Sequence, residues 1–315
     1  TQRERRNVYL RQSQKAFIYR KFIMKKMINY HTHTYRCGHA LGNEYEMVEA
    51  ALHEGYQELG MSCHIALPHY RSHLLHSLTS IRSLQGLKSC IGALLRNGPK
   101  MRMPYNEKQD YLDALDYCQK HFHYIKIYKG FEAEYFEDYL DYYQSLLDSG
   151  EVDYLILGHH FHKHSIHDCY YGRKNLKKKD LLHYAEELEK AMDTGLFSYV
   201  AHPDLFLMGY GKIDDVSKEV ILRICKKAKA TNTPLELNAG GVRKGKVKMN
   251  GKDVYPYANA YFFQIASMIG NDIILGLDAH SPDQLSYEMY HYLEKLAEEY
   301  HLHVLNQIEF KKGKQ

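Results

Sequence analysis

The chain has 315 residues, of which 44% are hydrophobic and 25% charged, a balance typical of a globular protein with a buried core. It contains no apolar run of roughly 18 residues and no apolar stretch of the kind that forms a signal peptide, so we expect a cytoplasmic protein without a membrane span. Its six scattered cysteines include no CxxC pair, which argues against a fold held by disulfides.

The formal net charge of +4 conceals a strongly basic N-terminus. Residues 1–27 contain nine Lys or Arg residues and one acidic residue, Glu4, so the rest of the chain is net acidic. A basic arm can bind nucleic acid or an anionic membrane. Because Met24 and Met27 precede the first predicted strand, we interpret residues 1–27 as an N-terminal extension, either a non-functional leader or not native to the protein. A single domain is then expected at 28–310.

Short apolar runs alternate with amphipathic stretches along this domain. The runs predict strands at 28–31, 56–62, 124–131, 152–157, 197–201, 234–237, 273–277 and 303–308. Helices are predicted from a capping box at Asn43 and Glu46 to about Glu54, and at 110–121, 137–147, 180–193, 216–230 and 258–269. Strands separated by helices predict a parallel sheet, and about seven such units favour a closed or distorted barrel. Residues 74–104 lack this rhythm, and we interpret them as an insertion beside the barrel mouth.

Unusual polar residues fall directly after the predicted strands, where α/β barrels hold their active sites. They are His31, His33, His39, His64, Glu132, His159, His160, His202, Asp204, Asp278 and His280. Any one of these histidines alone would most simply be a surface residue or a hydrogen-bonded core residue. Imidazoles and carboxylates that converge on one mouth need partners, however, and cations are the economical ones. The pattern therefore predicts a metal site.

Six segments carry these residues in a fixed order. They are His31-Thr32-His33-Thr34 with Cys37-Gly38-His39, Gly60-Met61-Ser62-Cys63-His64, Gly130-Phe131-Glu132-Ala133-Glu134-Tyr135, Leu157-Gly158-His159-His160-Phe161, Ala201-His202-Pro203-Asp204 and Asp278-Ala279-His280-Ser281-Pro282. Their order resembles the polymerase and histidinol phosphatase (PHP) superfamily, and within it the histidinol-phosphatase branch. Relatives usually carry Asp at the position of Cys63, so the chain departs from the family pattern there.

The resemblance implies a distorted (β/α)7 TIM-like barrel with a trinuclear metal site at the C-terminal ends of its strands. It assigns the first ion to His31, His33, Glu132 and Asp278, the second to Glu132, His160 and His202 with Glu132 as the bridge, and the third to His39, His64 and His280. The three divalent ions are expected to be zinc, iron or manganese, which imidazole and carboxylate ligands suit.

A further segment, Glu236 to Lys244, is similar to one in histidinol phosphatases that carries an arginine in contact with phosphate. The planar guanidinium of Arg243 suits a phosphate dianion, although a solvated loop rich in Gly and Lys is the alternative interpretation. We expect His159 to contact the substrate or to support the site. The proton for the leaving group is expected from His202, Asp204 or a water on a metal ion.

These residues predict a metal-dependent phosphomonoesterase with Asp278, Glu132, His202 and Arg243 as catalytic residues. The resemblance implies hydrolysis of L-histidinol phosphate to L-histidinol and phosphate in histidine biosynthesis, by attack of a hydroxide that bridges two ions, without a phosphoenzyme. The alternatives are a PHP phosphoesterase for another small phosphate monoester and a nucleic-acid-associated PHP module. Residues 28–315 are net acidic and lack a stripe of basic residues, which argues against the nucleic-acid-associated module. The expected partner is a small phosphorylated substrate and no membrane, and the sequence leaves the oligomeric state open.

Overall fold

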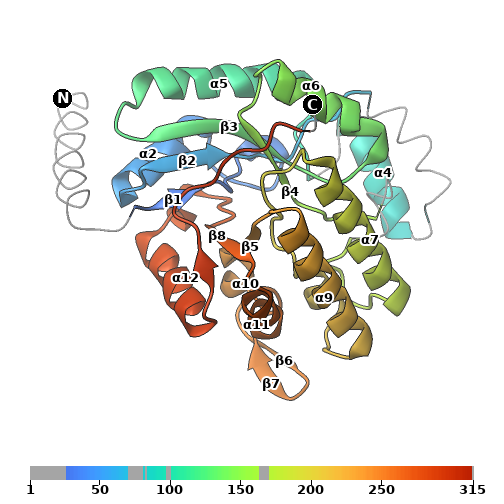
Figure 1. Ribbon diagram of the computed structural model, residues 1–315. Helices are drawn as coiled ribbons and strands as arrows, with labels where there is room; N and C mark the ends of the chain where they lie inside the picture. Colours follow the sequence, from blue (N-terminus) through green and yellow to red (C-terminus); the bar gives the residue numbers. More distant parts are fainter. Residues whose placement is uncertain (1–25, 70–80, 82–83, 97–100, 163–169, 314–315) are drawn as a thin grey trace.

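A computed structural model describes residues 26–69, 81, 84–96, 101–162 and 170–313. A curled, parallel four-stranded sheet contains β1 (Ile28–Asn29), β2 (Glu58–Met61), β3 (Lys126–Ala133) and β4 (Tyr154–Leu157), in that order (Figure 1). A second parallel sheet contains β5 (Leu235–Asn238), β8 (Asp272–Gly276) and β9 (His303–Val304). The strands β6 (Val247–Met249) and β7 (Lys252–Val254) form a separate antiparallel hairpin.

Isolated bridges connect the two parallel sheets. Val200 forms parallel bridges with Leu157, the last residue of β4, and with Leu235 of β5. Glu236 donates its backbone N–H to the Val200 carbonyl over 2.9 Å. On the other side, Thr32 forms a parallel bridge with Ala279, beyond β8. In the predicted strand at 197–201 only Val200 is a bridged residue, although Ser198, Tyr199 and Ala201 also form main-chain hydrogen bonds with β4. The segment ends at His202, whose φ of 32° is not extended.

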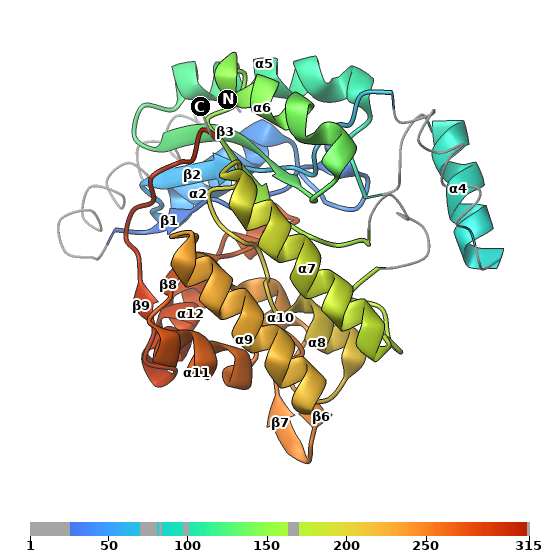
Figure 2. The ribbon, with the colours of Figure 1, turned by 45° about the vertical axis from the view of Figure 1, so that its right-hand side comes forward.

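Helices cover the outside of both sheets (Figures 1 and 2). They are α2 (Glu44–Glu54), α4 (Leu84–Arg96), α5 (Lys108–His121), α6 (Leu140–Asp148), α7 (Lys178–Thr194), α8 (Leu205–Tyr210), α9 (Asp215–Ala230), α10 (Ala239–Arg243), α11 (Ala260–Ile269) and α12 (Tyr287–Glu299). Short 3-10 turns occur at η1 (Tyr35–Cys37), η2 (Tyr105–Glu107), η3 (Glu137–Tyr139) and η4 (Pro282–Gln284). None of the described helices is long and apolar enough to cross a membrane.

Several predicted boundaries are confirmed and others shift. The capping box at the start of α2 is present, since Glu46 N–H donates to Asn43 Oδ1 over 3.0 Å and Asn43 N–H donates to Glu46 Oε2 over 2.9 Å. The last predicted strand, 303–308, is only the two residues of β9. Helix α4 lies in the segment predicted to be an insertion and projects from the body in Figure 2. The described residues do not include 1–25, nor 74–80, 82–83 and 97–100 of the predicted insertion. The predicted domain boundaries therefore stay predictions.

The interior between the strands is filled below the carboxyl ends. A buried cluster there includes Tyr30, which follows β1, Tyr154 of β4, Tyr199 and Ile274 of β8. Tyr154 donates its hydroxyl to the Tyr30 carbonyl over 2.8 Å, and its ring occupies the space beside Gly60 and Gly130, where a Cβ atom would overlap it. This aromatic layer fills the lower part of the interior, and the histidines and carboxylates of the candidate site lie above it, at the carboxyl ends of the strands.

Candidate metal centre

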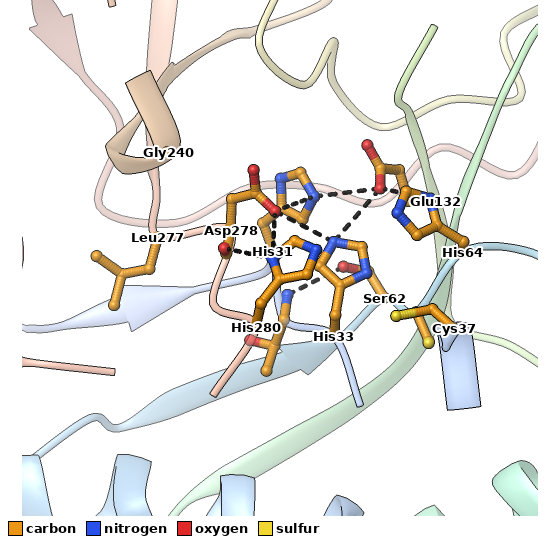
Figure 3. Close-up of polar contacts among 12 residues, drawn as sticks. His31, His33, Cys37, Ser62, His64, Glu132, Gly240, Leu277, Asp278 and His280 are labelled. Carbon is orange, nitrogen blue, oxygen red and sulfur yellow. Dashed lines mark hydrogen bonds and ion pairs between the residues drawn. The ribbon is translucent and has the colours of Figure 1, made fainter. Parts of the chain in front are cut away.

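His31, His33, Glu132 and Asp278 face one another at the ends of β1, β3 and β8 (Figure 3). Asp278 Oδ1 lies 3.5 Å from His31 Nε2 and 3.2 Å from His33 Nε2. Glu132 Oε2 lies 3.5 Å and 3.4 Å from the same two nitrogens. Ligand atoms around one tetrahedral zinc ion are also about 3.3 to 3.5 Å apart, so this arrangement suits a single divalent ion.

Glu132 is the carboxylate that most imidazoles share. Its Oε2 also lies 3.0 Å from His64 Nδ1, while its Oε1 lies 2.9 Å from His202 Nε2 and 3.5 Å from His160 Nε2. The imidazoles of His160 and His202 lie with their centroids 4.8 Å apart. The two oxygens of one buried carboxylate therefore face two different groups of histidines, which is the arrangement a bridging ligand requires.

A third group of imidazoles lies on the outer side of His33. His280 Nε2 is 2.9 Å from His39 Nε2, and the ring centroids of His39 and His64 are 5.2 Å apart. Ligand atoms of His33, His64 and His280 lie within 4.8 Å of one another. His39 is exposed whereas His64 is buried, so this group reaches from the interior to the surface. All nine predicted ligands are thus brought together.

Glu236 orients two of these histidines from behind. This fully buried residue of β5 accepts a hydrogen bond from His31 Nδ1 over 2.8 Å through Oε1, and one from the backbone N–H of His202 over 2.9 Å through Oε2. When the ring is neutral and its Nδ1 proton is held by Glu236, the lone pair of Nε2 points toward Glu132 and Asp278. The carboxylate therefore fixes the tautomer that a metal ligand needs.

Glu134 and Arg102 support the opposite side of the centre. Glu134 Oε1 lies 3.4 Å from His160 Nδ1 and also forms an ion pair with Arg102 Nη2, and both partners are 1% exposed. Met103 N–H donates to the carbonyl of His64 over 3.4 Å. The end of the predicted insertion thus supports two candidate ligands, His64 through its backbone and His160 through Glu134.

Burial and charge oppose each other at the centre. Burial disfavours ionisation of Glu132, but His64, His160 and His31 hold the pKa of this carboxyl well below its usual value. Burial also disfavours protonation of His31, but Glu236, Asp278 and Glu132 raise its pKa well above the usual value. At His64 burial prevails and lowers the pKa well below the usual value. The carboxylates therefore stay ionised and need positive charge nearby, which bound cations supply when they replace protons.

Arg243 lies at the end of α10, and its guanidinium holds the backbone of Asp278. Nη1 donates to the Leu277 carbonyl and Nη2 to the Asp278 carbonyl, each over 2.8 Å. Asp278 has a φ of 49°, a left-handed conformation that costs a non-glycine residue about 1 to 3 kcal/mol. Arg243 thus stabilises the strained backbone of a candidate ligand, and its predicted contact with phosphate stays a prediction.

His159 and Asp204 point to other partners. His159 Nδ1 accepts from Tyr135 N–H over 3.3 Å, and its Nε2 donates to Glu187 Oε2 on α7 over 2.8 Å. Both ring nitrogens are therefore engaged, and the structure does not place His159 among the nine, which leaves its predicted substrate contact unsupported. Asp204 accepts from Asn259 N–H over 2.7 Å, and burial raises the pKa of its carboxyl to about 7. The donor of the leaving-group proton stays a prediction.

Comparison with known proteins places the chain among its relatives. The model of the PHP domain matches residues 29–240, about two thirds of the sequence. The chain belongs to the PHP family. A search of curated proteins finds no match.

Two solved structures resemble the fold of this PHP protein. One is a protein assigned as a histidinol phosphatase from Listeria monocytogenes, with a TM-score of 0.61 and 19% identity, covering 84% of this chain and 100% of the other. The second is histidinol phosphate phosphatase from Lactococcus lactis, solved with zinc, L-histidinol and phosphate, with a TM-score of 0.60 and 15% identity, covering 91% of this chain and 100% of the other. At such identities the likeness shows the fold.

Two glycines of this PHP protein make room for buried carboxylates. A Cβ atom on Gly158 would overlap Glu132 Oε1, and one on Gly276 would overlap Glu236 Oε1. We expect Gly158→Ala to displace the shared carboxylate and to weaken metal binding by at least about ten-fold, the lower range for loss of an outer-sphere partner. Metal retained after dialysis measures this effect. Gly92→Ala is the matched control, because nothing lies within 4 Å of its added Cβ. Equal metal retention by both variants would contradict the expectation.

Sequence reasoning missed three supporting residues. Glu236 and Glu134 had a usable signal, since each is a carboxylate in or beside a buried strand, and Glu134 lies two residues after Glu132. Arg102 had none, because it lies in a segment without periodicity and its partner is 32 positions further along the chain.

Proposed function

We propose that the protein is a metal-dependent phosphomonoesterase of the histidinol-phosphatase kind. The observation that carries the proposal is the Glu132 carboxylate, whose two oxygens face separate groups of imidazoles. His31 Nε2, His33 Nε2 and Glu132 Oε2 are also buried without a hydrogen-bond partner among the described residues. Unpartnered polar atoms of this kind are costly, and cations would satisfy them.

The ligands divide into three sets in this proposal. The first ion would be held by His31, His33, Glu132 and Asp278, the second by Glu132, His160 and His202, and the third by His39, His64 and His280. Bound divalent cations lower the pKa of water and offset charge on phosphoryl oxygens. Zinc, iron and manganese all suit these donors. We further propose that β1 to β4, the segment around Val200, β5 and β8 form one distorted seven-stranded barrel around the site, with β9 beside β8, within a single domain at 28–310.

The protein's own groups have separate tasks in this mechanism. Glu236 holds His31 and the backbone of His202, and Glu134 faces His160, so the ligand rings keep their orientation while the substrate binds. Arg243 holds the backbone of Asp278, and its remaining donors would be offered to a phosphate oxygen. The aromatic layer below the centre excludes water from that side, so substrate would enter from the side of the exposed His39.

The substrate that we propose is L-histidinol phosphate. Support comes from the Lactococcus lactis structure, which was solved with zinc, L-histidinol and phosphate, and from its likeness to this fold. Phosphate release from L-histidinol phosphate should exceed release from other small monoesters and should disappear after chelation. Asp278→Asn should lower it by at least about a hundred-fold, because the variant weakens the first ion and one charged ligand is lost. Hydrolysis of another ester alone would refute the substrate, and hydrolysis of none by metal-loaded protein would refute the function.

A further inference from the structure

Two thiols lie directly beside one of the proposed metal ligands. Cys37 Sγ, Cys63 Sγ and a ring nitrogen of His33 lie within 4.8 Å of one another, and all three side chains are fully buried. The Thr34 carbonyl holds both thiols in place, accepting from Cys37 Sγ over 3.2 Å and from Cys63 Sγ over 3.8 Å. The cluster is therefore ordered by its own hydrogen bonds.

The nitrogen of His33 that faces the thiols is Nδ1. His33 Nε2 faces the carboxylates of Glu132 and Asp278, and Cys37 lies on the side of the ring away from Asp278 (Figure 3). Nδ1 is buried and makes no hydrogen bond of sound geometry within the described residues. This differs from His31, whose Nδ1 is held by Glu236. A buried polar atom that lacks a well-formed hydrogen bond is stabilised by a ligand, so Nδ1 would gain from coordination.

Two thiols and an imidazole form a donor set for a soft divalent cation. Around a tetrahedral zinc ion, two sulfurs lie about 3.8 Å apart and a sulfur and a nitrogen about 3.6 Å apart. The three ligand atoms lie no more than 4.8 Å apart, so each pair would have to approach by no more than about 1 Å to coordinate such an ion. The path from the surface to the thiols is short, because Cys37 is followed by the exposed residues Gly38 and His39.

We propose that Cys37, Cys63 and His33 Nδ1 form a second binding site, for a thiophilic divalent cation such as Cd²⁺, which shares only His33 with the proposed catalytic ligands. Each thiol releases one proton on binding, so one ion displaces two protons and binds two thiolates. A neutral imidazole has one lone pair, so coordination through Nδ1 moves the ring proton to Nε2. His33 then no longer serves the first ion, and the soft cation inhibits the phosphatase. This inhibitory effect, unlike the binding itself, rests on the proposed function.

Cadmium titration of the full chain tests the binding. Because the proposed catalytic ligands contain no sulfur, an ultraviolet sulfur-to-cadmium charge-transfer band reports this cluster. We expect the band to saturate at one equivalent, with two protons released per ion. The variant Cys37→Ala/Cys63→Ala should lose the band, whereas Cys225→Ala, which changes a buried thiol on α9, should keep it. Should the double variant fold poorly, each single alanine variant is expected to weaken binding. No band in the wild type, or an unchanged band in these variants, overturns the proposal.

Inhibition separates this site from the function of the centre. In zinc-loaded enzyme, Cys37→Ala/Cys63→Ala should need at least about ten times more Cd²⁺ than the wild type for half inhibition, as expected from loss of first-sphere thiolates. Equal sensitivity would overturn the competition for His33. If no phosphate ester is hydrolysed, the proposed function fails, whereas the charge-transfer band still decides the cadmium site.

Discussion

Glu132→Gln is expected to remove the bound metal ions and to abolish phosphate release. The glutamine side chain is nearly the same size, but it is neutral and one of its two polar atoms is a hydrogen-bond donor. Glu132 lies within 3.5 Å of nitrogens from five histidines, so the substitution removes a carboxylate that both groups of imidazoles share. We expect a loss of at least about a hundred-fold in metal affinity, beyond the range for outer-sphere changes.

Metal content after gel filtration, measured by atomic spectroscopy beside phosphate release, checks this expectation. Glu187→Gln is a matched control, because Glu187 is a buried carboxylate that pairs with the imidazoles of His159 and His162 but lies outside the nine ligands. The control should keep its metal and most of its activity. A Glu132→Gln protein that retains three ions would show that this carboxylate is no bridge, and loss of metal from both variants would point to a general effect of removing buried charge.

Arg102→Met is expected to destabilise the fold by about 3 to 5 kcal/mol, the usual cost of removing one partner from a buried ion pair. Arg102 and Glu134 are both 1% exposed, so solvent screens little of their interaction. The substitution leaves the Glu134 carboxylate buried, with its Oε1 3.4 Å from Nδ1 of His160. The Arg102 guanidinium also lies 5.5 Å from the centre of the Phe136 ring, and methionine keeps part of this packing.

Urea denaturation of the metal-free protein measures the effect without a contribution from bound ions. The double variant Arg102→Met/Glu134→Met removes both charges and should recover most of the loss, because an apolar pair can replace a buried ion pair at little cost. Equal destabilisation by the single and double variants would attribute the loss to packing. A single variant as stable as the wild type would show that the ion pair contributes little.

The sequence predicted the ligand-bearing segments well because they combine two strong local signals. His31 and His33 alternate in an extended segment, and Glu132 and Asp278 end apolar runs, so both their structural position and their chemistry could be recognised. The helix start at Asn43 was equally local, since a capping box involves residues three apart. Each of these features depends on neighbours in the sequence, and the structure confirms their placement.

Features that depend on distant partners could not be predicted in this way. The predicted strand at 197–201 is bridged only at Val200, and its end is set by the left-handed backbone of His202. Arg243 had the right shape for phosphate, but nothing in its segment indicated the carbonyls of Leu277 and Asp278, more than thirty residues away. His159 was grouped with His160 because they are adjacent, although neighbouring residues in an extended segment point to opposite sides.

The bridges at Val200 and Thr32 have a consequence for the mechanical coupling of the molecule. Between the two parallel sheets, the main-chain pairing is short, with a few hydrogen bonds around Val200 and beside Thr32, so bound ions would add to the contacts that resist relative displacement of the sheets. The proposed ligands come from both sides of these junctions, with Glu132 and His160 on the four-stranded sheet and Asp278 beyond β8 of the other. Ions bound between them would join the two halves of the chain as cross-links. The same cations would then stabilise the fold and take part in catalysis. Hydrogen exchange of the backbone amides near Val200 would slow when the cations bind.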